Sequence, residues 1–233
     1  MKKLIYLFAA AMLILNTGAC SDDDSDSSAT TTQAQPDAEV NEQDAEAETS
    51  TTDGEEEPED LTDLALALDD LPAGWAENNS EGDDSDPVEC LEPLDDNDDL
   101  EGTQTGEAEV AYMRGTGVPQ LDQLLVELPD DAEASEALDL IAGVIEECGE
   151  FEESDDDGEA ITGQIGRVQL DPIEGAERQE TFQLTATTQG INVSAAMVLL
   201  QKGPYLTFLV LTDTGSFDPA EAAEFATTAV DKL

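Results

Sequence analysis

Apolar and polar positions recur along this chain with two different periods, and together they predict a domain of helices and strands between residues 61 and 233. Helical spacing is found in three segments, which start at Leu61, after Asp130 and after Asp218. Period-two alternation or a short apolar run predicts six strands, over residues 109–114, 121–128, 161–170, 180–187, 191–201 and 205–212.

Both later helices have N-terminal capping signals. Asp130 is followed three residues later by Glu133, as in a capping box, and Asp218 is followed directly by Pro219. Their predicted inner faces are Leu138, Ile141, Ala142, Ile145 and Cys148 in one, and Ala222, Phe225, Ala226, Ala229, Val230 and Leu233 in the other. The two segments are therefore predicted to pack against a sheet.

Tight turns at Gly190 and at Gly203-Pro204 join the last three strands into a meander. The last two strands are apolar on both faces, which places them centrally, while Gly166 interrupts the alternation of its strand and indicates a bulge. The predicted fold class is α+β, with a single antiparallel β-sheet and helices packed on one face.

The first 19 residues have the pattern of an export signal. Lys2 and Lys3 precede an apolar run from Leu4 to Leu15, which is too short to span a bilayer, and small residues lead to Cys20. The short segment ending Gly-Ala-Cys resembles the lipobox of bacterial lipoproteins, with Thr17 where leucine is usual. That resemblance implies a lipid on Cys20 and a location on the extracytoplasmic face of the cell membrane. An ordinary secretory signal is the alternative.

Residues 20–60 have a different composition from the rest of the chain. After Cys20 they are nearly all Ser, Thr, Asp, Glu, Gln, Ala and Pro, with Val40 as the one large aliphatic residue. Such a segment buries too little apolar surface to offset the entropy of ordering it, and its charges repel one another. We predict a disordered acidic tether between the anchor and the domain at 61–233.

Acidity dominates the whole chain, whose formal net charge is -51. Residues 1–60 hold 16 of the 58 acids and 2 of the 7 bases, which leaves 42 acids against 5 bases, or -37, in residues 61–233. Nucleic acid is excluded as a partner, because its recognition requires a basic surface. The acidity indicates either adaptation to salt or a recognition face for a basic partner.

The sequence contains few of the residue patterns that are typical of catalytic or metal-binding sites. The chain has no histidine, so it has no Ser-His-Asp or Cys-His arrangement and no histidine zinc site. The acidic run from Asp95 to Asp99 has the first spacings of a calcium loop, but Leu100 and Gly106 occupy positions that require Gly and Glu. The run at 155–158 is incomplete as well. We expect no cofactor, no designed metal site and no enzyme activity.

Two further features bear on the domain. Cys90 and Cys148 remain as a pair once Cys20 is assigned to the export signal, and an extracytoplasmic setting favours a structural disulfide over a redox or metal site. Trp75 is the one tryptophan. It is interpreted either as part of the core or as a wall of a ligand cleft.

The element order, the Leu-Pro-Ala-Gly-Trp segment at 71–75 and the cysteine that ends the middle helix resemble a known group. They are similar to actinobacterial envelope lipoproteins and to the extracellular sensor domains of mycobacterial Ser/Thr kinases. The resemblance implies a sheet with helices on one face, a cleft and disulfides. It favours a non-enzymatic binding or sensing domain for an apolar envelope molecule or an envelope protein. A hydrolase with paired carboxylates and a purely structural envelope component are the alternatives.

Overall fold

The computed structural model describes residues 58–78, 89–95, 103–115, 117–154, 160–188 and 190–233. The predicted export signal, Cys20, nearly all of the tether and most of the two acidic runs considered for calcium lie outside the described residues. No helix within the described ranges is long and apolar enough to cross a membrane.

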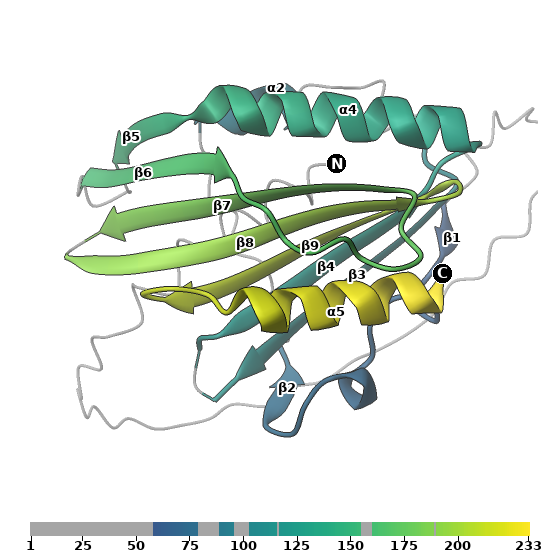
Figure 1. Ribbon diagram of the computed structural model, residues 1–233, viewed down its shortest axis with the longest axis horizontal. Helices are drawn as coiled ribbons and strands as arrows, with labels where there is room; N and C mark the ends of the chain where they lie inside the picture. Colours follow the sequence, from purple (N-terminus) through teal and green to yellow (C-terminus); the bar gives the residue numbers. More distant parts are fainter. Residues whose placement is uncertain (1–57, 79–88, 96–102, 116, 155–159, 189) are drawn as a thin grey trace, which may run out of the picture. The chain divides into compact units, whose positions relative to one another are not determined.

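One sheet contains all the strands of the described residues (Figure 1). The strands are β1 (Glu59–Asp60), β2 (Trp75–Glu77), β3 (Gly106–Arg114), β4 (Gln120–Glu127), β5 (Glu150–Ser154), β6 (Ala160–Arg167), β7 (Arg178–Thr188), β8 (Ile191–Lys202) and β9 (Tyr205–Thr214). The helices are η1 (Leu68–Asp70), η2 (Glu89–Leu91), α2 (Glu92–Asp95), α4 (Asp131–Cys148) and α5 (Pro219–Lys232).

The strand order is β1-β3-β4-β9-β8-β7-β6-β5, with β2 also paired to β3. The predicted meander of β7, β8 and β9 is confirmed, and so is the α+β class. The prediction of a purely antiparallel sheet is wrong at one edge, because Glu59 and Asp60 pair with β3 in parallel. Every other pairing between the named strands is antiparallel.

The two long helices lie on opposite faces of the sheet, so the prediction that the helices share one face is wrong. Successive side chains of a strand point to opposite faces, and β8 shows the division directly. Three of its residues, Ala195, Met197 and Leu199, belong to the hydrophobic cluster that contains the buried side chains of α4, which we call the α4 cluster. The three that alternate with them, Ala196, Val198 and Leu200, belong to the cluster that contains the buried side chains of α5, which we call the α5 cluster. A strand that is apolar on both faces requires a layer on each.

Both predicted helices form at the predicted caps. Oδ1 of Asp130 accepts hydrogen bonds from the backbone N–H groups of Ala132 at 2.8 Å and Glu133 at 3.0 Å. Oδ1 of Asp218 accepts one from the N–H of Ala220 at 2.9 Å. These bonds satisfy donors that a helix start leaves without partners.

The predicted first helix does not form. Residues 61–67 make a turn with no helix, and only η1 follows. Side chains of the sheet form hydrogen bonds with backbone groups that would otherwise bond within a helix. The Leu66 N–H donates to Gln123 Oε1 at 2.7 Å, and Tyr112 O–H donates to the Leu66 carbonyl at 2.8 Å. Leu61 and Ala65 are buried in a small cluster on the same side. Tertiary contacts therefore override the helical spacing.

Two further predictions in the β5–β6 region are wrong. Residues 150–154, which are not among the predicted strands, form β5, in which Phe151 pairs with Gly163 and packs over it. The bulge predicted at Gly166 is absent, since the register between β6 and β7 runs unbroken and pairs Gly166 with Gln183. The glycine at position 163 allows β5 to pair with β6, because a larger residue there would overlap the Phe151 ring.

Basic residues tie the helices to the rest of the domain. Beyond Lys2 and Lys3 the chain has five bases, and each contacts an acid or a carbonyl. The pairs are Arg114 with Glu221, Arg167 with Glu146 and Glu180, Arg178 with Asp139, Lys202 with the Val230 carbonyl and Lys232 with Asp70. Each pair or group joins α4 or α5 to a strand or to η1.

Candidate functional site

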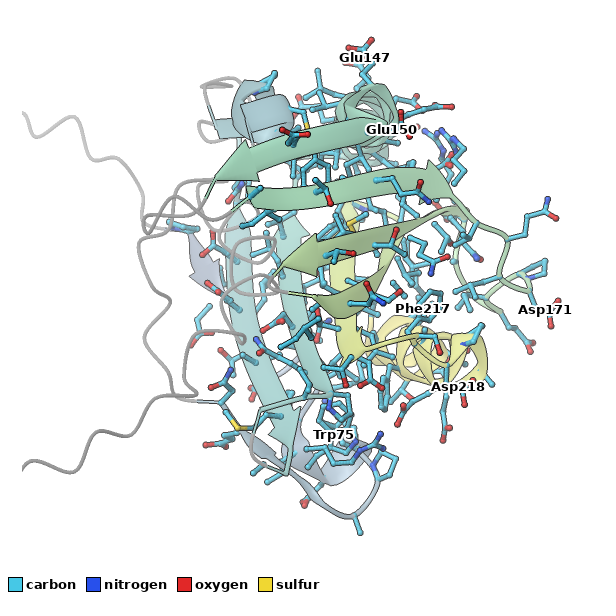
Figure 2. The ribbon with its side chains drawn as sticks, turned by 90° about the vertical axis from the view of Figure 1, so that its left-hand side faces the viewer. Trp75, Glu147, Glu150, Asp171, Phe217 and Asp218 are labelled. Carbon is cyan, nitrogen blue, oxygen red and sulfur yellow. A yellow bond between two sulfur atoms is a disulfide. The ribbon has the colours of Figure 1, made fainter. Side chains whose placement is uncertain are left out.

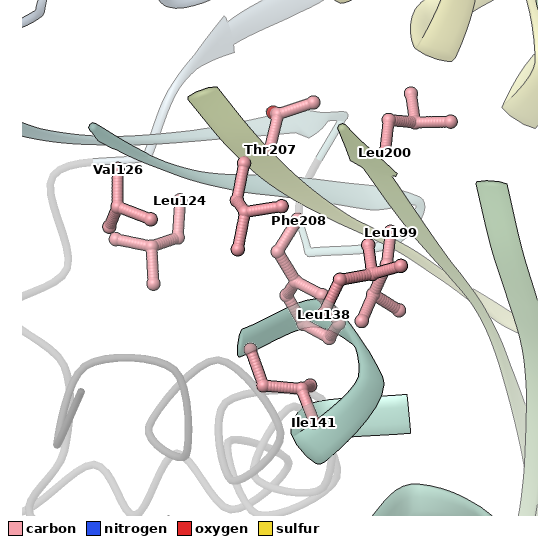
Figure 3. A pocket seen from close by; sticks show the side chains of 9 residues that line it. Leu124, Val126, Leu138, Ile141, Leu199, Leu200, Thr207 and Phe208 are labelled. Atoms are coloured by element: carbon pink, nitrogen blue, oxygen red, sulfur yellow. The ribbon is translucent and has the colours of Figure 1, made fainter. Parts of the chain in front are cut away.

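An apolar pocket lies between α4 and the sheet, and we call it the α4-face pocket (Figure 3). Seven residues line it from the α4 side, namely Leu124, Val126, Leu138, Ile141, Leu199, Leu206 and Phe208. Leu200 and Thr207 border it from β8 and β9, although their side chains belong to the opposite face of the sheet. The free space is about 20 Å³, close to the volume needed to hold one water molecule. A pocket with this lining and size has room for a ligand only if α4 and the strands separate.

The sheet surface under α4 changes from apolar to polar along β4 and β9. Leu124 of β4 pairs with Phe208 of β9 in the pocket, and the next pair on the same face is Asp122 with Val210. The pair after that is Gln120 with Thr212. Successive pairs on one face are about 6.6 Å apart along a strand. Polar side chains thus follow the pocket lining on the same face.

Gln120, Asp122 and Thr212 form a buried polar group, which we call the Asp122 cluster. The exposed fractions of these residues are 5%, 2% and 0%. Gln120 Nε2 donates to both carboxylate oxygens of Asp122, at 2.9 Å and 3.0 Å. Thr212 Oγ1 is buried and has no hydrogen-bond partner among the described residues. A buried polar atom without a partner costs about 1–3 kcal/mol, so the cluster is a destabilising feature of the domain.

The electrostatics of Asp122 differ from those of a surface carboxylate. Burial raises the pKa of Asp122 to about 7, the hydrogen bond from Gln120 acts in the opposite direction, and the charge of Glu109 adds to the rise. The folded domain therefore holds this group partly protonated near neutral pH. A carboxyl that can gain or lose its proton in a dry site is a feature of functional sites more often than of structural ones.

The opposite face of the sheet holds a second buried polar group, which differs because its members have partners. Gln123 Nε2 donates to Thr207 Oγ1 at 2.9 Å, while Gln123 Oε1 accepts from the Leu66 N–H at 2.7 Å. These bonds fix the segment at 61–71 over the sheet. The contacts of Gln123 and Thr207 thus show that they hold another segment of the chain in place. Asp122 and Thr212 make no comparable contact to another segment among the described residues.

Trp75 lies apart from the α4-face pocket. It is buried in the α5 cluster, where its ring meets Phe225 edge-on at 5.5 Å between centroids and Arg114 lies 5.3 Å from its centre. Figure 2 shows Trp75 well separated from Glu147, which marks α4. The contacts resemble those of a core residue, although Nε1 is buried and has no hydrogen-bond partner on the described part of the chain. A ligand-binding role for Trp75 stays a prediction.

Cys90 and Cys148 meet at disulfide distance, with Cα atoms 5.2 Å apart. Cys148 is the last residue of α4, and Cys90 belongs to η2. The bond therefore joins the end of α4 to the segment that precedes β3. Leu91 and Leu94, from the same short segment, are buried in the cluster that contains the pocket lining.

A larger and more open hollow lies at the ends of β5–β8, with a volume of about 420 Å³. Its described lining residues are Glu150, Thr162, Gly163, Gln164, Thr185, Ala186, Thr187, Asn192, Val193 and Gly215. Glu150 is the one carboxylate among them. Within the described ranges, no three His, Cys, Asp or Glu side chains gather closely enough to hold a metal ion.

No residue of the Asp122 cluster stands out from the sequence as a candidate site. The available signal is the presence of Asp122 in the predicted strand at 121–128, where it shares one face with Leu124 and Val126, since aspartate is disfavoured in strands and rarely buried without a partner.

Comparison with known proteins gives a match at the level of structure. The crystal structure of the extracellular domain of PknH from Mycobacterium tuberculosis matches with a TM-score of 0.50 and 11% sequence identity. The match covers 72% of this chain and 92% of that chain. No protein-family model and no curated protein matches the sequence. The two domains share a fold. The sensor-domain resemblance is thereby confirmed for the fold, while lipoprotein status stays a prediction.

Proposed function

We propose that this chain is a non-enzymatic, extracytoplasmic lipoprotein whose domain binds an apolar ligand in the α4-face pocket. The observation that supports the proposal is the apolar pocket under α4, which lies beside the buried and incompletely satisfied Asp122 cluster. Stability alone does not favour retaining such a cluster, because an apolar residue of the same size would remove the cost. The fold shared with an extracellular domain agrees with a location outside the cytoplasm.

Ligand entry in this proposal moves α4 away from the sheet. The helix is held by the disulfide at Cys148 and by ion pairs to β6 and β7, and the ion-paired side chains are partly exposed. Exposed ion pairs contribute little to stability, about 0–1 kcal/mol each, so they oppose such a movement weakly. A shift of α4 is then the change by which binding is reported to the rest of the molecule.

A hydrolase is the less favoured interpretation. Glycoside hydrolysis requires two carboxyl groups about 5–10 Å apart in an open groove. The open hollow at the ends of β5–β8 has one carboxylate, Glu150, among its described lining residues. The hollow therefore lacks the second carboxylate on the described part of the chain.

The test is a titration of the full chain with Nile red, a neutral apolar dye whose fluorescence rises in an apolar site. Ile141→Trp fills the pocket and is expected to lower dye affinity at least tenfold. Leu140→Trp is the matched control, because Leu140 is the preceding residue on the same helix and is 39% exposed. Leu138→Ala enlarges the pocket and is expected to raise affinity, with folding of each variant verified by circular dichroism.

Equal dye binding by the Ile141 and Leu140 variants would contradict a site under α4. Absence of dye binding by every folded variant would favour the purely structural alternative. The anchor is tested separately. Cys20→Ala should move the protein from the membrane fraction to the soluble fraction and abolish its labelling by palmitate.

A further inference from the structure

The Asp122 cluster presents more hydrogen-bond acceptors than its neighbours fill. A carboxylate has about four positions that can accept a hydrogen bond. The Asp122 carboxylate accepts from one side-chain donor among the described residues, Gln120 Nε2, which reaches both of its oxygens. Thr212, paired with Gln120 across the two strands, has a buried hydroxyl without a partner among the described residues. The group that would complete this cluster is therefore a hydrogen-bond donor, with N–H or O–H bonds.

The domain provides no cation for Asp122. Each of the five bases beyond Lys2 and Lys3 contacts another group, and none of those contacts involves Asp122. The remaining two, Lys2 and Lys3, belong to the predicted export signal. A positive charge at Asp122 in the mature protein must then come from a bound molecule.

Position along the strands links the cluster to the pocket. Asp122 and Leu124 are alternate residues of β4 on one face, and their partners Val210 and Phe208 are alternate residues of β9. An extended molecule lying along this face meets apolar side chains at Leu124 and Phe208 and then the carboxyl of Asp122. An amphiphile has the same order, with an apolar tail that would lie at Leu124 and Phe208 and a polar head group that would lie at Asp122.

We propose that the α4-face pocket and the Asp122 cluster are one binding site for an amphiphile with a protonated amine head group. The apolar chain lies on Leu124 and Phe208, and the ammonium group donates to Asp122 and Thr212. An ammonium group has three donors and a positive charge, and a charge-assisted hydrogen bond in a dry site is about twice as strong as a neutral one. This inference rests on the proposed function and specifies the class of ligand.

An anionic head group does not fit the same place. A carboxylate or phosphate would face the Asp122 carboxyl and Glu109, whose charge already acts on Asp122. The formal net charge of -51 repels it as well. An alcohol fits sterically but lacks the charge. Head groups therefore rank as amine, alcohol and carboxylate in decreasing affinity.

The test uses three ligands with the same ten-carbon chain, namely decylamine, decanol and decanoate, below their critical micelle concentrations. Each displaces Nile red from the full chain at pH 8 and 0.15 M salt. Decylamine should displace the dye at a concentration at least tenfold lower than decanol, and decanoate should be the weakest. Asp122→Asn should remove the advantage of decylamine over decanol and leave decanol unchanged. Thr212→Val should reduce the advantage about threefold.

Asp213→Asn is the matched control, because Asp213 is the residue after Thr212 on β9, lies on the opposite face and is half-buried. It removes one negative charge without touching the cluster, so it measures general attraction of amines to the acidic protein. Equal affinities for decylamine and decanol, or equal effects of the Asp122 and Asp213 variants, would overturn this inference and leave the proposed function intact. Failure of wild-type protein to bind the dye would overturn both.

Discussion

Asp122→Asn replaces the buried carboxyl of β4 with a group of the same size that does not ionise. Burial raises the pKa of Asp122 from its ordinary value of 3.8 to about 7 in the folded domain. In the unfolded chain the carboxyl is solvated and ionises near its ordinary pKa. The two states thus bind different numbers of protons between about pH 4 and pH 7, and stability must change with pH over that window.

The sign of the change follows from which state holds the proton. Below about pH 4 the carboxyl is protonated in both states and its burial carries no charge penalty. As pH rises towards 7 the unfolded chain loses the proton and the folded domain keeps it, so wild-type stability falls. The total loss is about 4 kcal/mol, at about 1.4 kcal/mol for each pH unit between the two pKa values. Above about pH 7 this contribution is constant.

The assay is urea unfolding of wild type and Asp122→Asn at pH 4, 5.5 and 8, followed by the fluorescence of Trp75, the one tryptophan. The amide introduced by this substitution has its own fixed cost, which is the same at each pH. The stability of the variant relative to wild type should therefore increase by about 4 kcal/mol from pH 4 to pH 8, and its relative Tm by about 10 °C.

Asp213→Asn controls for the removal of one negative charge outside the cluster. A stability difference between Asp122→Asn and wild type that is the same at pH 4 and at pH 8 would refute the reasoning. It would show that Asp122 ionises alike in the folded and unfolded states. The functional interpretation of the cluster would then lose its energetic support.

Three other measurements test the structure. Gly163→Ala should lower the free energy of unfolding by about 1–3 kcal/mol, because a Cβ would overlap the Phe151 ring, whereas the same change at Gly166, where a Cβ meets nothing within 4 Å, should be near neutral. Replacing both Cys90 and Cys148 with Ala should lower it by about 4 kcal/mol, since the bonded cysteines are 58 residues apart in the chain, and an unchanged urea midpoint would contradict that estimate. The Tm of the wild-type protein should rise from low to molar salt as self-repulsion is screened, which a salt-independent Tm would disprove.

Elements with strong local signals were predictable from the sequence. The helices after Asp130 and Asp218 begin where the capping residues place them, and β8 and β9 match their apolar runs within a few residues. The need for a helix on each face follows from the same residues, because a strand with apolar side chains at both Met197 and Val198 needs cover on both sides. The period alone does not say which helix covers which face.

Elements that depend on distant partners were not predictable. The segment from Leu61 is held by Gln123 and Tyr112, whose contact with Leu66 depends on the folded sheet. The strand β5 depends on Gly163, which leaves space for an aromatic ring from another strand. The Asp122 cluster was missed for a related reason. One aspartate among 58 acids is uninformative until its burial and its lack of a positive partner are known.

The two helices are held by different kinds of cation. Guanidinium groups of Arg167 and Arg178 hold α4, whereas Lys202 and Lys232 provide two of the three ties to α5. Acylating reagents neutralise lysine and leave arginine charged. Amine-directed labelling of the folded protein would thus loosen α5 selectively. The helix α4, which covers the α4-face pocket, would remain in place, so a chemical reagent can act on one face of the sheet and spare the other.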